Sequence, residues 1–453
     1  MTTHVFAGPT ITPAQIRALL PDAMLHPPVA HGDLLRLGLN AGDRVLIIDG
    51  LWHQSAPVRH KEILLLLSRG ICVFGAASMG ALRAAELAPY GMVGIGQIFR
   101  AFRDGSLDAD DEVAVLQGTD NRPLTLALVN VRQMLRTAVE AGRITQAQAL
   151  ALADVAAGLP YGRRSRTALG RAAADHNLRE AYEAAQSGEC GLPHDQKRED
   201  AECALRLLAR GASTPASHPA WAGEPWETSF VRAWRAVREP AGSCGLPFLA
   251  LLQHQQLYDP QFPSRWRGHV LSKLLGKAPV SVCGSMVEDW AAERGLAVRD
   301  LSDEQVQYWL TPDEIHRPGQ REKLVLILVR SARLDDSWPV LPCSPQEAAG
   351  LFDPHRGTEE DVRDAMRTNA AHQADHPQHT LAHLNPARLA AHLLQGWGLA
   401  LDSGPRQRDA AAGDRGLRSF HAAVEICRSF YLGALTKDSS AVATAGASAS
   451  SRT

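Results

Sequence analysis

Ser78 lies in a stretch whose residue types could support nucleophilic catalysis. The spacing Ala76-x-Ser78-x-Gly80 differs by one methyl group from the Gly-x-Ser-x-Gly pattern, in which a sharp turn exposes a serine hydroxyl. Residues 71–74 form a short apolar run typical of a buried strand, and residues 79–87 are rich in helix-forming Ala and Leu. We therefore expect Ser78 in a strand-to-helix turn, with its hydroxyl at the carboxyl end of the strand.

The residues that follow Ser78 would supply the hydrogen-bond donors that such a reaction needs. The first amides of a helix have no partner within the helix, so those of Met79 and Gly80 could hold an oxyanion. Serine is also a favoured residue at the N-cap of a helix. The local sequence alone leaves both roles open, a nucleophile or a helix cap.

Lys61 is the residue that we single out as a base for Ser78. Only six of the 47 Lys and Arg residues are lysines, and an arginine does not give up its proton in a protein. Residues 57–68 predict a largely apolar helix, so we expect Lys61 to be buried. Burial lowers the pKa of an amine by up to about 3 to 5 units, enough for it to accept a serine proton. The alternatives are a lysine that extends to solvent and a structural ion pair with Glu62 or Glu86.

Strand-like and helix-like segments alternate through the first part of the chain. This alternation predicts an α/β fold with a mainly parallel sheet and flanking helices. Residues 113–116 could form a further strand, followed by helices over 124–141 and 146–157. The loops that follow parallel strands gather at one edge of the sheet, where ligands usually bind. We expect that edge to hold Gly8-Pro9-Thr10, Asp49-Gly50 and Ser78.

The second half of the chain has a helical pattern. Capping-box sequences such as Ser302-x-x-Gln305 mark several helix starts in it. The stretch 211–225 is rich in Ala, Ser and Pro, which favours a domain boundary there. We divide the chain into an α/β core over 1–157, a helical continuation of that core over 158–210, a linker over 211–225, an α-helical region of unknown role over 226–435 and a disordered tail over 436–453.

The composition excludes several classes of function. A formal net charge of −2 over 453 residues gives no basic surface for nucleic acid. The start of the chain has no leader pattern and no apolar run is long enough to cross a bilayer, so we expect a cytoplasmic protein without a membrane segment. The seven cysteines form no Cys-x-x-Cys pair, which argues against a zinc site or a disulfide framework.

Three further clusters could bind ligands, and each has a plainer explanation. The glycines at 91, 94 and 96 resemble part of a nucleotide-binding loop, but no strand is expected before them, and we interpret them as a flexible, narrow channel wall. The carboxylates at 110, 111 and 112 could hold a metal, although a solvated turn or helix cap is the simpler interpretation. Five histidines lie between His372 and His392, with Pro377 breaking the helix between them. We therefore expect no metal and no cofactor.

A series of short motifs in order carries a resemblance to a known family. The motifs include His60-Lys61-Glu62-Ile63-Leu64, Gly75-Ala-Ala-Ser78-Met79-Gly80-Ala-Leu-Arg83-Ala-Ala-Glu86, Gly91-Met92 and Asp110-Asp111-Glu112-Val-Ala, preceded by Gly8-Pro9-Thr10, Pro27-Pro28, Gly32-Asp33 and Ile48-Asp49-Gly50. In this arrangement the chain resembles the TfuA family over roughly residues 4 to 150. A weaker similarity continues through Lys197-Arg198-x-Asp200-Ala201.

The resemblance implies a role beside a YcaO protein in thioamidation of a peptide backbone. In this family the YcaO partner activates the amide of a precursor peptide, and the TfuA-like protein releases sulfide from a ubiquitin-like carrier that ends in a thiocarboxylate. The resemblance places a Ser-Lys pair on Ser78 and Lys61.

Other residues would assist that pair. Arg59 and Arg83 could attract the thiocarboxylate, and Asp49 or Glu62 could position Lys61. The glycines Gly91, Gly94 and Gly96 could line a groove for the carrier tail.

Two other classes of function stay open. One is a non-catalytic binding module that docks and activates YcaO for its peptide, with Ser78 only as a helix cap. The other is a Ser-Lys amidase that acts on a small molecule. A lysine amine about 3 Å from the Ser78 hydroxyl would favour catalysis, because a docking module needs no such contact.

Overall fold

The computed structural model describes residues 2–52, 55–118, 122–187, 195–212, 220–223, 227–241, 244–277, 284–316, 319–334, 341–354 and 357–450. Its internal contacts divide the chain into two compact units, Met1–Trp226 and Glu227–Thr453. Much of the stretch 211–225, where we predicted a linker, lies outside the described residues.

A five-stranded sheet forms the centre of the first unit. Its order is β2-β1-β3-β4-β5, and every neighbouring pair is parallel. The strands are β1 (Thr3–Phe6), β2 (Met24–His26), β3 (Arg44–Ile47), β4 (Cys72–Ala76) and β5 (Val93–Ile95). The chain adds β2 on one side of β1 and β3 to β5 on the other, so the strand order reverses between β1 and β3. Open α/β sheets usually bind ligands at such a position.

Helices cover both faces of this sheet. Alternate side chains of β3 and β4 project to opposite faces, and all of them are buried. On one face they pack with α3 (His60–Ser68) and α4 (Met79–Leu87). On the other face they pack with α1 (Pro13–Leu19) and α10 (Gln196–Ala209). The short α2 (Asp33–Arg36) and α5 (Gln97–Asp104) complete the layer on the first face.

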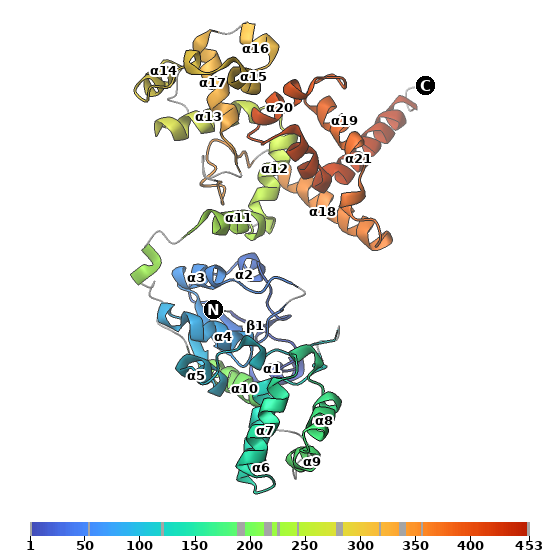
Figure 1. The fold of residues 1–453 in the computed structure, drawn as a ribbon. Helices are drawn as coiled ribbons and strands as arrows, with labels where there is room; N and C mark the ends of the chain where they lie inside the picture. The colour runs from blue at the N-terminus through green and yellow to red at the C-terminus, as the bar shows by residue number, and fades with distance from the viewer. Residues whose placement is uncertain are drawn as a thin grey trace. The chain divides into compact units, whose positions relative to one another are not determined.

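A smaller helical group adjoins the sheet (Figure 1). It has its own apolar core, centred on residues such as Leu135, Leu152 and Leu169. Its helices are α6 (Leu128–Glu140), α7 (Gln146–Ala157), α8 (Arg166–Asp175) and α9 (Arg179–Gln186), with 3-10 turns at η2 (Asp110–Glu112) and η3 (Tyr161–Arg163). Two further 3-10 turns of the first unit lie against the sheet helices, η1 (Ala88–Tyr90) beside α4 and η4 (Ala220–Gly223) beside α3. The residues 113–116, expected as a strand, follow η2 as irregular chain.

Helices dominate the described residues of the second unit, which also hold one isolated bridge between Pro240 and Pro247. The core of this unit surrounds the buried Trp266, against which Gly416 packs so closely that a Cβ there would lie 2.6 Å from the indole. The helices are α11 (Ser229–Arg238), α12 (Phe248–Tyr258), α13 (Phe262–Leu275), α14 (Gly284–Ala292), α15 (Asp303–Trp309), α16 (Pro312–His316), α17 (Gln320–Ser331), α18 (Thr358–Asp375), α19 (Pro386–Gly396), α20 (Pro405–Gly413) and α21 (Phe420–Ser450), with 3-10 turns at η7 (Val298–Asp300) and η8 (Leu381–His383).

These features confirm the predicted class, an α/β core with a parallel sheet followed by an α-helical region. The division of the chain into domains stays a prediction, and so does the disordered tail over 436–453, part of which is assigned to α21 (Phe420–Ser450). Its last part is rich in alanine, which has the highest helix propensity of the amino acids. Among the described residues, no helix combines the length and the apolar character needed to cross a membrane.

Candidate active site

Ser78 occupies a sharp turn between β4 and α4. The preceding Ala77 has φ +67°, which is rare for a residue with a side chain and costs of order 1–3 kcal/mol. Ser78 itself has φ −117° and ψ −121°, lies at the N-cap position of α4 and is buried. Its side chain makes no capping hydrogen bond to the helix. Ser78 is therefore the N-cap residue without a side-chain cap bond, and the strand-to-helix turn that we predicted is present.

Two glycines let β4 and α4 approach closely enough to form this turn. A Cβ on Gly80 would lie 1.8 Å from the Ile47 carbonyl oxygen of β3, and a Cβ on Gly75 would lie 2.1 Å from the Gly80 carbonyl oxygen. The Gly80 amide donates a hydrogen bond to the Ile48 carbonyl at 3.3 Å. The Gly80 amide is therefore already hydrogen-bonded. Of the two amides predicted as oxyanion donors, that of Met79 stays the candidate.

The Ser78 hydroxyl and a lysine amine converge on one carbonyl oxygen. Ser78 Oγ donates to the Val113 carbonyl at 3.4 Å. Lys197 Nζ donates to the same carbonyl at 3.0 Å. Lys197 belongs to the first turn of α10, far from Ser78 in sequence. The structure therefore brings Lys197, rather than Lys61, into the neighbourhood of the serine.

The surroundings of Lys197 favour the neutral amine. The side chain is buried, and this burial lowers its pKa below the ordinary value of 10.5. The negative charges of Asp49 and Asp195 act in the opposite direction. The amine lies 3.9 Å from Asp49 Oδ1, longer than a hydrogen bond. Desolvation of the amine thus goes together with one hydrogen-bond acceptor among the described residues, the Val113 carbonyl.

Asp49 fixes the loop that follows β1 beside this pair. Its Oδ2 accepts the amides of Gly8 at 2.9 Å and Thr10 at 3.1 Å, and its Oδ1 accepts the Thr10 hydroxyl at 2.6 Å. These bonds join the loops after β1 and β3 across the point where the strand order reverses. The three loops that we expected at this edge, including the turn at Ser78, are indeed gathered around one cavity.

The start of α10 is held in place by two polar clusters. Asn130 Oδ1 accepts the Lys197 amide at 3.3 Å, and its Nδ2 donates to Asp195 Oδ1 at 2.8 Å. One turn later, Asp200 accepts the amides of Gln97 and Ile98 at the start of α5, at 2.9 and 2.8 Å. These contacts fix the direction in which the Lys197 side chain leaves its helix.

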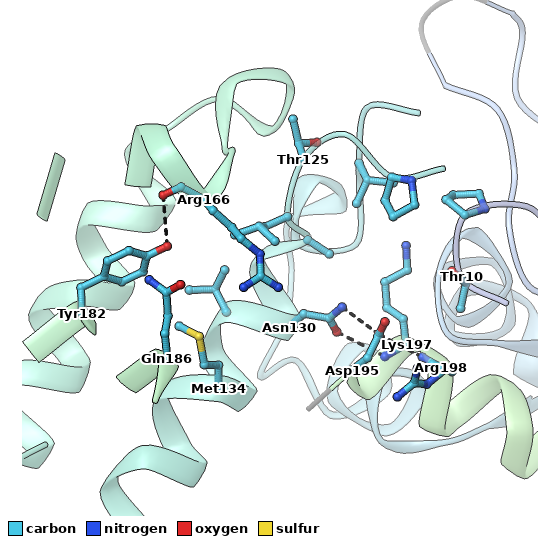
Figure 2. Close-up of a pocket in the computed structure, with 16 residues that line it drawn as sticks. Thr10, Thr125, Asn130, Met134, Arg166, Tyr182, Gln186, Asp195, Lys197 and Arg198 are labelled. Carbon is cyan, nitrogen blue, oxygen red and sulfur yellow. Dashed lines mark hydrogen bonds between the residues drawn. The ribbon is translucent and has the colours of Figure 1, made fainter. Parts of the chain in front are cut away.

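A cavity of about 50 Å³ contains the serine and the lysine. It is lined by Pro9, Asp49, Gly50, Leu51, Trp52, Ser78, Ala114, Val115, Leu116, Gln117, Tyr161 and Lys197. A second cavity of about 250 Å³, which we call the side pocket, shares Pro9, Val115 and Lys197 with the first (Figure 2).

Lys61 and Glu62 lie on α3, and neither lines the Ser78 cavity. Lys61 is partly exposed, so the expectation that it is buried is wrong. It lies in the first turn of α3, ahead of the buried apolar residues of that helix. Glu62 is buried but binds other groups, accepting the Gly32 amide at 2.8 Å and contacting His31 Nδ1 at 2.7 Å. Burial raises the pKa of Glu62, and these hydrogen bonds oppose the rise. Glu62 therefore anchors the loop before α2.

The two predicted arginines lie outside the Ser78 cavity as well. Arg83 Nη1 donates to Glu86 at 2.6 Å, and its Nε donates to the Val58 carbonyl at 3.3 Å. Glu86 also contacts His60 Nε2 at 2.8 Å, so these residues clamp α3 to α4. The Arg59 side chain is exposed.

Two of the three glycines predicted to line a carrier groove serve close packing in this structure, and the third lies in a turn. Gly94 lies in β5, where a Cβ would lie 2.1 Å from the Phe99 ring. Gly96 precedes α5 with φ +103°, and a Cβ there would meet Asp200 at 2.2 Å. Gly91 has φ +105° in the turn before β5. None of them lines the Ser78 cavity or the side pocket.

The acidic run after Ala109 is engaged with guanidinium groups. Asp111 accepts from the buried Arg164 at 2.9 Å, and Glu112 accepts from Arg132 Nη2 at 2.8 Å. Glu112 in turn raises the pKa of Arg132. Within the described parts of the chain, no group of three or more His, Cys, Asp and Glu side chains is arranged to hold a metal ion.

Lys197 is the site residue that we missed. The sequence contains a signal for it, because it is one of six lysines and belongs to Lys197-Arg198-x-Asp200-Ala201, where the resemblance weakly continues. Its approach to Ser78 depends on how α10 crosses the sheet, which local patterns do not reveal.

The fold and this cavity define a class: a parallel α/β unit with a buried serine and lysine at the carboxyl edge of its strands. Residues 49–165 match the family model TfuA, described as TfuA-like protein. The segment 49–165 is thus similar to TfuA-like proteins, and the resemblance inferred from the motifs is confirmed over that segment. The segment includes Asp49, Ser78 and Val113, whereas Lys197 follows it. No curated protein matches the chain.

Proposed function

We propose that the first unit is a serine–lysine hydrolase that cleaves a thiocarboxylate and releases sulfide for a YcaO partner in the cytoplasm. The observation that carries this proposal is the convergence of Ser78 Oγ and Lys197 Nζ on the Val113 carbonyl inside one cavity. The family match supports the sulfur-delivery role. A ubiquitin-like carrier as the thiocarboxylate donor, and a precursor peptide bound by YcaO, are parts of the same proposal.

The first step forms an ester on Ser78. Neutral Lys197 accepts the hydroxyl proton as Ser78 Oγ attacks the thiocarboxylate carbon. The carbon–sulfur bond then breaks with its electron pair on sulfur, and Lys197 returns the proton so that hydrosulfide leaves. The oxyanion that forms between these events lies near the start of α4, where the Met79 amide can donate to it.

The second step regenerates the serine. Lys197 takes a proton from water as that water attacks the ester carbon, and then donates the proton to Ser78 Oγ as the carbon–oxygen ester bond breaks. The acyl group leaves as a carboxylate, and one further proton is released to solvent. Asp49 keeps the loop of Gly8 and Thr10 against the cavity during both steps.

The docking-module alternative has less support. It needed Ser78 only as a helix cap, and the Ser78 side chain makes no cap hydrogen bond. It also gives no reason for a fully desolvated lysine beside a buried hydroxyl, since burying a charged amine costs several kcal/mol unless it is paired or neutral.

Sulfide release from a thiocarboxylated carrier protein tests this function. We expect the wild-type chain to release sulfide, and Ser78→Ala to reduce kcat/KM by roughly 10³- to 10⁶-fold, because the nucleophile is absent. Binding of the YcaO partner is measured on the same samples and should not change. Equal release by both proteins, or no release by wild type together with intact YcaO binding, would favour the docking module.

A further inference from the structure

Two arginines whose guanidinium groups have no described partner line the side pocket. It lies between the sheet unit and the helical group, and Figure 2 shows the Arg166 guanidinium reaching into its interior. Arg198 lines the same pocket from α10. Among the described residues, neither guanidinium makes a hydrogen bond or an ion pair, whereas Arg132 and Arg164 nearby are paired with carboxylates.

The acidic side chain in this pocket is already engaged. Asp195 caps α10 by accepting the Arg198 amide at 3.1 Å, and it also accepts from Asn130 at 2.8 Å. Tyr182 directs its hydroxyl to the Arg166 carbonyl at 3.2 Å, away from the guanidinium. The charge that the pocket offers to a ligand is therefore positive. The rest of the wall is largely apolar, with Pro123, Leu126, Ala127, Val131 and Met134.

The side pocket adjoins the reacting groups directly. Pro9, Val115 and Lys197 line both cavities, so the side pocket and the Ser78 cavity are direct neighbours. The side pocket has a volume of about 250 Å³. This is slightly below the roughly 300 Å³ at which small-ligand sites begin, and it suits a short segment with one or two side chains.

We propose that the side pocket binds the part of the substrate chain that precedes the reacting acyl group, and that it selects a segment with a carboxylate side chain, which pairs with Arg166. This inference rests on the proposed hydrolase function and adds the specificity of its substrate. A guanidinium recognises a carboxylate through two parallel hydrogen bonds. Arg198 supplies a second cation at the end of the pocket nearer to α10.

The test uses short synthetic peptide thiocarboxylates that differ at one position, Glu or Gln, scanned along the residues before the reacting group. At one position we expect kcat/KM to be about 10-fold higher for Glu than for Gln, the effect of a charge-assisted hydrogen bond. Arg166→Met should abolish this preference, and Arg198→Met is a second variant that should reduce it. Arg163→Met is the matched control, because Arg163 is exposed on η3 and does not line the pocket. It should keep the full preference.

Binding of the corresponding peptide carboxylates to Ser78→Ala separates the two proposals. Tighter binding of the Glu peptide, dependent on Arg166, supports the side-pocket assignment even if wild type releases no sulfide from any peptide, a result that would overturn the hydrolase function alone. Turnover with equal kcat/KM for Glu and Gln at every position would overturn the side-pocket assignment and leave the hydrolase function intact.

Discussion

Replacing Lys197 by methionine should lower sulfide release by roughly 10²- to 10⁴-fold, the contribution of a general base. Methionine keeps an unbranched, apolar side chain in a buried position and removes the amine that contacts the Val113 carbonyl. The same change at Lys61, which is partly exposed and does not line the Ser78 cavity, should alter release by less than roughly threefold. The measurement is kcat/KM with a thiocarboxylated carrier for wild type, Lys197→Met and Lys61→Met.

The pH dependence of the same reaction checks the protonation state. A base must be unprotonated, so wild-type activity should rise with pH and level off at the pKa of Lys197, which burial places below 10.5. In Lys197→Met this rise should be absent. A large loss in Lys61→Met with full activity in Lys197→Met would instead return the base to the lysine of α3.

Gly80→Ala should destabilise the first unit by at least about 3 kcal/mol and remove its activity. The added Cβ would lie 1.8 Å from the Ile47 carbonyl oxygen, so α4 must move away from β3. Such a movement also breaks the hydrogen bond from the Gly80 amide to Ile48 and displaces Ser78. Chemical denaturation of the full chain, followed alongside sulfide release, measures both effects.

Gly38→Ala provides the matched control for that substitution. Gly38 lies in the same unit, and no atom lies within 4 Å of a Cβ built there. The change should shift the free energy of unfolding by no more than about 0.5 kcal/mol. Equal stability of Gly80→Ala and Gly38→Ala would show that α4 does not depend on close contact with β3.

Several elements could be predicted because their signals are local. The helix over 146–157 follows Thr145, which forms a capping box with Gln148, and the structure has α7 at Gln146–Ala157. The helix over 79–87 coincides with α4. The turn at Ser78 could be predicted because an apolar strand, small residues and a helix-forming run follow one another.

The outer strands could not be predicted in the same way. β2 and β5 are three residues each, and β5 consists of Val93, Gly94 and Ile95, in which the glycine weakens any strand pattern. Their structure comes from pairing with β1 and β4, a tertiary effect. The same glycine accommodates the Phe99 ring of α5, a contact that the local sequence pattern does not reveal.

The lysine of the site was missed for a related reason. A buried, apolar helix predicts that its polar residues share the burial, but Lys61 lies at the start of α3, where one side remains accessible. Lys197 lies in a helix with many charged residues, including Arg198 and Glu199. The hydrophobic pattern of that helix therefore does not indicate that Lys197 is buried. Burial of a single side chain depends on which neighbouring helix covers it.

The most direct test of the central claim is the detection of a covalent ester on Ser78. The full chain is mixed with a thiocarboxylated carrier in a single turnover, quenched in acid at successive times and analysed by intact mass and peptide mapping. We predict an adduct of the carrier acyl group on Ser78 that forms with sulfide release and is absent from Ser78→Ala. Sulfide release without such an adduct, or an adduct that maps to another residue, would contradict the account.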